Sequence, residues 1–176
     1  MHRIVTWIST NDTQAFKFIN HRLKCKFFDF FLPKITHVGG ATFTISSMMF
    51  IILFSEPIIR LIAVKALLSL ALSHVFVHII KKIYCRERPY VKLTDIRLGA
   101  HPLKDYSFPS GHTTAVFSIA VVFSLHSIFL ALILLPLAVL VGFSRMYLGL
   151  HYPTDCIVGA MLGTISSFIL FFIPYL

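Results

Sequence analysis

Charged residues are scarce in this sequence, and acidic residues are the scarcest of them. Only 13% of the 176 residues are charged, and Asp and Glu together number 7. Soluble domains carry about a quarter charged residues, so the composition argues against a soluble domain. Hydrophobic residues instead make up 57% of the chain. The composition therefore predicts a protein embedded in a membrane.

Other familiar patterns are also missing. Cys25, Cys85 and Cys156 lack the spacing of a metal site, and an odd number cannot all pair within the chain, so we assign them no role. The first 20 residues lack a continuous apolar core and a small-residue cleavage site, so we expect no cleavable signal peptide. No repeat, low-complexity segment or linker divides the chain, which predicts a single domain over residues 1–176.

Long apolar stretches dominate the rest of the chain. A membrane span needs roughly 20 mostly apolar residues, and the longest stretch, residues 113–143, is long enough for two short spans with a turn at His126 and Ser127. We expect an all-α fold, a polytopic helical bundle of about five transmembrane spans. The expected spans cover about 40–55, 58–80, 111–125, 128–144 and 154–174.

The first 38 residues have a different pattern. Between residues 16 and 31, aromatic and aliphatic residues interleave with Lys and Arg. This pattern is typical of an amphipathic helix that lies in the membrane interface, with its aromatic rings at the acyl boundary and its cations at the headgroups. A merely basic segment beside the membrane is the alternative. The helical bundle is then expected to occupy residues 39–176.

The chain is basic, with a net charge of +9. The cations flank apolar spans, which makes nucleic acid a poor partner and favours anionic bilayer headgroups or a phosphorylated substrate. Five spans place the amino terminus, loop 81–110 and loop 144–153 on one face of the membrane. All Lys and Arg residues except Arg60 and Lys65 lie in or beside this face. The positive-inside rule would put this face in the cytoplasm, but an anion-binding site would need the same cations on either side.

The first polar segment of interest is KKIYCRERPY, which contains Lys81, Arg88 and Pro89. Cations at the exit of a membrane helix usually reach toward the interface. That explanation suffices for Lys81 and Lys82, but it accounts less well for Arg86 and Arg88, which precede a proline that fixes the backbone.

The second segment is Pro109-Ser110-Gly111-His112, at the expected start of a span. Serine is a good N-cap, glycine allows close approach of a ligand, and the free N–H groups of a helix start bind anions. His112 would lie in the first helical turn. Taken alone, the segment is also compatible with a simple helix cap and an interfacial histidine.

The third segment is SRMYLGLHYPTD. Pro153 suits the first position of a helix, and Asp155 follows His151 by four residues, so its carboxylate can orient the imidazole. Asp155 could instead complement only the positive helix start. An acidic residue near a histidine at membrane depth is nevertheless a functional hypothesis. With Arg145 and the other two segments it predicts an oxyanion site for phosphoryl transfer, in which either histidine could be the nucleophile.

The three segments resemble the signature of the type 2 phosphatidic acid phosphatase superfamily, whose membrane branch dephosphorylates lipid phosphates and diphosphates. That signature reads Lys-x6-Arg-Pro, Pro-Ser-Gly-His and Ser-Arg-x5-His-x3-Asp, and every spacing is kept between residues 81 and 155. The first 80 residues match only in being membrane-like. The short chain suggests the compact bacterial members, such as undecaprenyl-diphosphate and phosphatidylglycerophosphate phosphatases.

The resemblance implies a role for each matching residue. His151 would be the nucleophile that forms a phosphohistidine, Asp155 would hold its ring, and His112 would be the general acid and then the base. The phosphate would be bound by Lys81, Arg88, Ser110, Gly111 and Arg145. Family members work without a metal cofactor. We therefore expect no metal, and we leave the His74 and His78 pair open between a metal site and polar residues near the site mouth.

The motifs do not specify the lipid. Undecaprenyl diphosphate is the first expectation, followed by phosphatidylglycerophosphate, phosphatidate or diacylglycerol diphosphate, or broad specificity. A small transporter is the rival of another class, but a transporter needs polar residues through the midplane, often in repeated broken helices. A catalytically inactive lipid-binding relative is disfavoured by the intact histidines. Bacterial relatives mostly act at the outer leaflet, so we expect a multi-pass cell-membrane protein with an extracytoplasmic site.

Overall fold

The computed structural model describes residues 2–173, and for residues 2–6 and 8 the backbone alone. Every regular element in this range is a helix. The helices are α1 (His2–Lys17), the π-helical η1 (Phe18–Arg22), α2 (Lys26–Ile35), the 3-10 helix η2 (Thr36–Gly39), α3 (Ala41–Phe54), α4 (Pro57–Tyr84), α5 (Pro89–Lys92), α6 (Gly111–Ser124), α7 (Ile128–Tyr147) and α8 (Pro153–Phe171).

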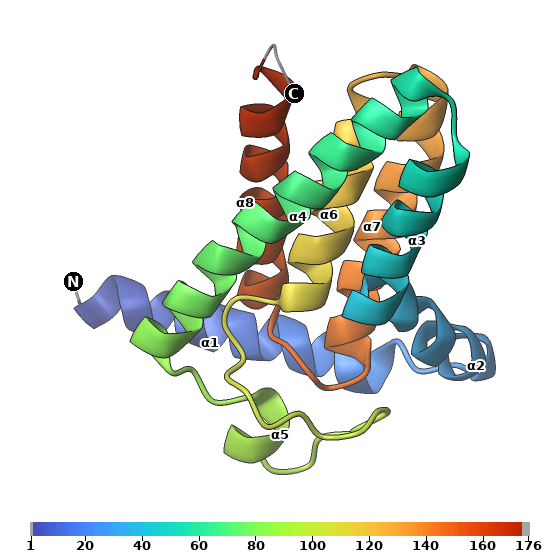
Figure 1. Ribbon diagram of the computed structural model, residues 1–176. Coiled ribbons are helices and arrows are strands. Elements are labelled where there is room, and N and C mark those ends of the chain that lie inside the picture. The colour runs from blue at the N-terminus through green and yellow to red at the C-terminus, as the bar shows by residue number, and fades with distance from the viewer. Residues whose placement is uncertain (1, 174–176) are drawn as a thin grey trace.

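Five helices form the bundle, and α6 lies at its centre. Helix α6 packs against α4, α7 and α8, and α3 packs against α4 (Figure 1). Gly159 and Gly163 allow α8 to approach α6 closely, since a Cβ at these positions would lie 2.7 Å from Ser110 O and 2.6 Å from Thr114 O. The amino-terminal parts of α6 and α8 therefore pack directly against each other.

The expected grouping of the loops at the two ends of the bundle is confirmed. The short turns after α3 and α6 and the end of α8 lie at one end of the bundle, whereas α1, α2, α5 and the long loop before α6 lie at the other end (Figure 1). Pro57 and Pro153 occupy first-turn positions of α4 and α8, where the missing proline N–H costs no helical hydrogen bond.

All five predicted spans correspond to helices, but the helices differ in length. Helices α7 and α8 and the segment 57–92 that contains α4 are each long and apolar enough to cross a membrane, whereas residues 26–39 and 41–54 pass that test only as a pair bent by 57°. Helix α6 has 14 residues. Separate crossings by α3 and α6 stay a prediction. Residue 174, the expected end of the last span, lies outside the described residues.

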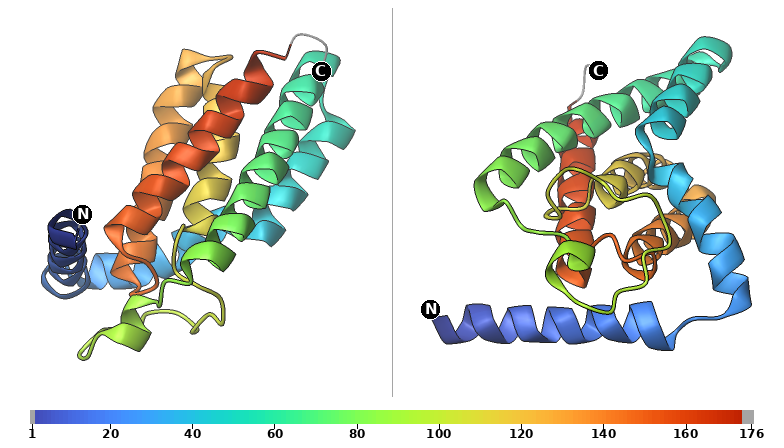
Figure 2. Two further views of the ribbon diagram at one scale, coloured as in Figure 1. Left: turned by 90° about the vertical axis from the view of Figure 1, so that its left-hand side faces the viewer. Right: turned by 90° about the horizontal axis from the view of Figure 1, so that it is seen from below.

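The amino-terminal segment lies across the end of the bundle that carries the loops. Figure 2 shows α1 running roughly perpendicular to the bundle helices and α2 continuing around the same end. The expected single interfacial helix is therefore two helices joined by η1. Not all of its aromatic residues face outward, because Phe16 is fully buried and its ring centroid lies 5.5 Å from that of Tyr152.

Candidate active site

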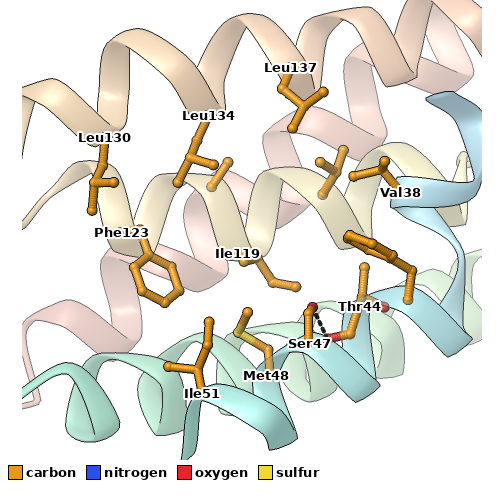
Figure 3. A pocket seen from close by; sticks show the side chains of 13 residues that line it. Val38, Thr44, Ser47, Met48, Ile51, Ile119, Phe123, Leu130, Leu134 and Leu137 are labelled. Atoms are coloured by element: carbon orange, nitrogen blue, oxygen red, sulfur yellow. Dashed lines mark hydrogen bonds between the residues drawn. The ribbon is translucent and has the colours of Figure 1, made fainter. Parts of the chain in front are cut away.

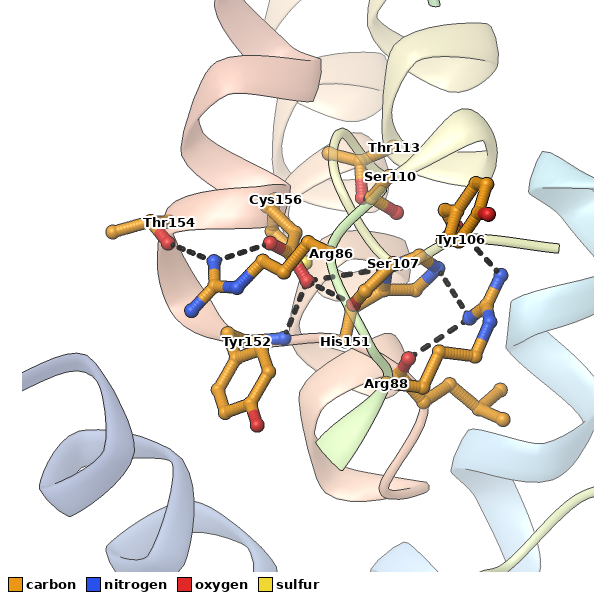
Figure 4. Close-up of polar contacts among 12 residues, drawn as sticks. Arg86, Arg88, Tyr106, Ser107, Ser110, Thr113, His151, Tyr152, Thr154 and Cys156 are labelled. Atoms are coloured by element: carbon orange, nitrogen blue, oxygen red, sulfur yellow. Dashed lines mark hydrogen bonds and ion pairs between the residues drawn. The ribbon is translucent and has the colours of Figure 1, made fainter. Parts of the chain in front are cut away.

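The three polar segments of the sequence meet at the end of the bundle that α1 crosses (Figure 4). The Ser110 N–H donates to the Asp155 carbonyl over 3.0 Å, which joins the second segment to the third. Arg88 Nη1 donates to the Leu150 carbonyl over 2.9 Å, which joins the first segment to the third. One backbone bond and one bond from a side chain to the backbone thus hold these distant parts of the chain around one point.

His151 lies at the centre of this cluster and is 1% exposed. Its Nε2 lies 3.1 Å from Arg88 Nη1, which always donates, so Nε2 is the acceptor. The ring proton then belongs on Nδ1, which lies 3.5 Å from Asp155 Oδ2. Burial lowers the pKa of His151 to about 3, so the imidazole is neutral at pH 7, with the Nε2 lone pair on the side of the guanidinium.

Asp155 is fully buried and held from several directions. Its Oδ1 accepts from Arg86 Nη1 over 2.6 Å, and its Oδ2 accepts from the Tyr152 N–H over 2.8 Å and from the Ser107 hydroxyl. These bonds leave its carboxylate little freedom to turn. The predicted pairing of Asp155 with His151 is therefore a 3.5 Å contact between two buried groups, in which Nδ1 of His151 makes no hydrogen bond to any described residue.

Arg86 and Asp12 complete this network, and the motifs include neither of them. Arg86 Nη2 donates to Asp12 Oδ2 over 2.6 Å, and the Thr154 N–H donates to Asp12 Oδ1 over 2.9 Å. Asp12 lies on α1, so the amino-terminal segment is fastened to the start of α8 beside Asp155. In the sequence, the only hint was that Arg86 is poorly explained as a membrane anchor.

Arg145 is 3% exposed and has spare hydrogen-bonding capacity. Its Nη1 donates to Thr36 Oγ1 over 2.8 Å, but Nε and Nη2 have no partner among the described residues. Arg145 and His112 line the same cavity of about 550 Å³. Unpaired buried donors are costly, so the cavity is suited to an anion that would accept from Arg145.

His112 reaches this cavity from the first turn of α6. Gly39 permits η2 to pass beside it, since a Cβ there would lie 2.8 Å from His112 O, and the Cβ position of Gly40 is 3.8 Å from His112 Nε2. Ser110 is the N-cap residue of α6, but its side chain makes no capping hydrogen bond. Its Oγ accepts from Thr113 Oγ1 over 3.0 Å instead.

Lys81 and Arg88 lie together beside Asp105. Lys81 Nζ lies 2.8 Å from Asp105 Oδ2, and Arg88 Nη2 lies 2.6 Å from Asp105 Oδ1. Burial raises the pKa of Asp105, but the hydrogen bond and charge of Lys81 and the charge of Arg88 outweigh it and lower the pKa to about 2. Asp105 is therefore an anion at neutral pH.

His74 and His78 do not join a larger group of possible metal ligands. Each Nδ1 lies 2.9 Å from a backbone carbonyl one turn earlier, Leu70 O and His74 O respectively. Among the side chains that the structure describes, residue 7 and residues 9–173, no three of His, Cys, Asp or Glu cluster as a metal site. His74 Nε2 is 4.0 Å from the Cβ position of Gly111, which puts it near the start of α6.

Known proteins are similar to this chain in sequence and in fold. The chain is 33% identical over 113 residues to the bacitracin transport permease protein BcrC of Bacillus licheniformis, covering 64% of this chain and 55% of that protein. It is 35% identical over 111 residues to an undecaprenyl-diphosphatase of Sulfolobus acidocaldarius, covering 62% and 54%. The chain thus spans about half the length of these curated relatives.

Two crystal structures extend the similarity to most of the chain. LpxE of Aquifex aeolicus superposes with a TM-score of 0.81 at 30% identity, covering 90% of this chain and 93% of that one. A transmembrane phosphatidylglycerolphosphate phosphatase of Bacillus subtilis superposes with a TM-score of 0.78 at 25% identity, covering 93% and 84%. The model of the PAP2 superfamily matches residues 62–175, which include all three polar segments. The resemblance read from the motifs is therefore confirmed, and the chain is a membrane protein that belongs to the PAP2 superfamily.

Proposed function

We propose that this protein hydrolyses a lipid phosphate or diphosphate through a phosphohistidine intermediate on His151. The observation that carries the proposal is the contact between Arg88 Nη1 and His151 Nε2 at 3.1 Å. This contact places the Nε2 lone pair of a neutral imidazole beside a cation that can bind the phosphate under attack. The Nδ1 proton of the same ring is then directed to Asp155.

The proposed reaction has two steps. Nε2 of His151 gives up its hydrogen bond from Arg88 Nη1 and attacks phosphorus. The bond from phosphorus to the leaving oxygen breaks, and His112 gives its proton to that oxygen. A water molecule then attacks the phosphohistidine and passes a proton to His112, the phosphorus–nitrogen bond breaks, and inorganic phosphate leaves. Lys81, Arg88 and Arg145 would offset the charge on the phosphoryl oxygens, assisted by Ser110 and Gly111. No metal takes part in the proposed steps.

A lipid tail has a suitable place beside the site. A groove of about 380 Å³ is bounded by α3, α6 and α7 and is lined almost entirely by apolar side chains (Figure 3). Val38 lines this groove and His37 lines the cavity that contains His112 and Arg145. The headgroup cavity and the apolar groove therefore adjoin along the backbone of η2.

Undecaprenyl diphosphate is the substrate that we favour. Several relatives are named undecaprenyl-diphosphatase, and Lys92, Arg97, His101 and Lys104 add positive charge to the loop before α6, which suits a diphosphate. Phosphatidylglycerophosphate, or a broad range of lipid phosphates, is the alternative, since relatives named phosphatidylglycerophosphatase also match. A transporter fits less well, because the described polar network gathers at one end of the bundle.

Phosphate release from a panel of lipids tests the proposal. We expect the purified protein in detergent to release phosphate with a chelator present, and to act on isoprenyl diphosphates with a kcat/KM about tenfold higher than on phosphatidylglycerophosphate or phosphatidate, because the added cations favour the second phosphate. An equal rate on all lipids would support broad specificity. No release from any lipid, or release that the chelator abolishes, would contradict the proposal.

We further propose that the site faces outward from the cell. Cys85 is the C-cap residue that follows α4 on the face of the site, and it is exposed. In intact cells that express a Cys25→Ser variant, an impermeant thiol reagent should label Cys85 as completely as a permeant one does. Labelling by the permeant reagent alone would place the site in the cytoplasm.

A further inference from the structure

Asp105 forms ion pairs with both of the cations that the first motif contributes to the site. Its carboxylate contacts Lys81 Nζ at 2.8 Å and Arg88 Nη2 at 2.6 Å. The adjoining backbone adds further contacts, because Asp105 O accepts from Arg88 Nε over 2.8 Å and Tyr106 O accepts from Lys81 Nζ. The two cations are therefore bound to a single short stretch of the loop before α6.

Arg88 has no free donor left for a substrate. Nη1 bonds to Leu150 O and His151 Nε2, whereas Nε and Nη2 bond to Asp105 and to Tyr106 O. The attack by His151 Nε2 releases one hydrogen of Nη1, but a phosphate that binds through Nε or Nη2 must replace Asp105 or the Tyr106 carbonyl. The carboxylate of Asp105 is the only anion among the described partners of Arg88, so it is the group that a phosphate oxygen can replace with the same charge and geometry.

The charges of the site support the same conclusion. Arg86 is paired with Asp12 and Asp155, and Lys81 and Arg88 are paired with Asp105. Among the described residues, Arg145 has no acidic partner and two unpaired donors. An arriving phosphate would satisfy Arg145 and would meet Asp105 at the other two cations, where like charges repel.

Asp105 is also placed so that it can move away. Its side chain is 56% exposed, whereas that of Arg88 is 3% exposed. It lies in the irregular part of the chain between α5 and α6, and no helix restrains it.

We propose that Asp105 is an internal anion that holds Lys81 and Arg88 between turnovers, and that the phosphate of the substrate must displace it. The inference rests on the proposed function of the site. Asp105 then sets the affinity of the site for phosphate: it weakens binding of the substrate, and by returning to the cations it helps inorganic phosphate to leave.

The test compares Asp105→Asn with Asp95→Asn. Asp95 lies in the same loop, is exposed, and has a positive φ of 61° that asparagine accepts. Both variants lose one negative charge, but only Asp105→Asn frees Lys81 and Arg88. We expect Asp105→Asn to bind inorganic phosphate about threefold to tenfold more tightly than the wild type, because two partly exposed ion pairs no longer compete. The readouts are the inhibition constant of phosphate and, without any lipid, the dissociation constant of phosphate obtained from the rise of Tm with phosphate concentration.

The kinetic constants separate this role from simple positioning. We expect Asp105→Asn to lower KM about as much as the phosphate inhibition constant, without raising kcat, since stronger ground-state binding alone does not accelerate the chemical step. Asp105→Glu, which keeps the charge, should bind phosphate within about twofold of the wild type. Phosphate binding by Asp105→Asn that is unchanged or weaker than in the wild type would overturn the inference, as would an Asp105→Glu protein that behaves like Asp105→Asn.

Phosphate binding to the site can be measured separately from lipid hydrolysis. The Tm measurement needs no turnover, so it reports on Asp105 even if none of the lipids tested is hydrolysed. An active wild type with no change in phosphate affinity for Asp105→Asn removes the inference alone.

Discussion

Replacing His151 with alanine should reduce the release of phosphate from every lipid substrate by about a thousandfold or more. In the proposed reaction His151 forms the bond to phosphorus, and no other described side chain combines a neutral imidazole with direct contact to Arg88. The variant should keep its fold, because the loop that carries residue 151 is also tied to Arg88 by the Leu150 carbonyl. The measurement is kcat on the favoured substrate in detergent, together with Tm.

A histidine at the opposite end of the bundle provides the matched control. His126 lies in the turn after α6, where its ring packs on Phe171. His126→Ala should retain activity close to that of the wild type. A His151→Ala protein that is folded and still hydrolyses lipid at a tenth of the wild-type rate would contradict the assignment of the nucleophile.

Replacing His112 with alanine should have a different consequence. General acid–base groups contribute about 10² to 10⁴ in rate, so steady-state turnover should fall by that factor. The first step on p-nitrophenyl phosphate should suffer less than the second, because the p-nitrophenolate leaving group needs no proton whereas the attacking water still needs a base. The variant should therefore release a burst of p-nitrophenol equal to the amount of enzyme and then turn over slowly.

The double variant distinguishes this burst from slow release of product. His112→Ala combined with His151→Ala should give no burst, because no phosphoenzyme can form. A burst that survives in the double variant would exclude His151 as its origin. A His112→Ala protein with no burst would contradict the prediction that the loss of His112 slows the second step more than the first.

Much of the site was predictable because the motifs lie at helix ends. Successive membrane helices are antiparallel, so a motif after the second span, one before the third and one between the fourth and fifth must share a face. Pro153 at a helix start and Asp155 four residues after His151 then specified the local geometry of the third motif. This part of the prediction needed only helix boundaries, which the apolar stretches marked well.

The residues that were missed make contacts over long distances in the sequence. Asp12 is joined to Arg86 and Thr154, which are 74 and 142 residues away in the sequence. No periodicity or motif links an amino-terminal helix to the start of the last one. The contact of Asp105 with Lys81 and Arg88 depends on the path of an irregular loop. In addition, α6 has only 14 residues, fewer than the roughly 20 that a membrane span needs. The hydropathy of the sequence therefore located this helix but did not establish that it crosses the bilayer.

The phosphoenzyme of the His112→Ala variant shows directly whether His151 forms the bond to phosphorus. The protein is mixed with labelled isoprenyl diphosphate or p-nitrophenyl phosphate, quenched in alkali, where a phosphohistidine survives, and digested for mass spectrometry. The proposed mechanism predicts a single phosphate per protein on His151, and none in the His112→Ala, His151→Ala protein. Phosphate found on another side chain, such as Ser110, or no bound phosphate while hydrolysis proceeds, would contradict it.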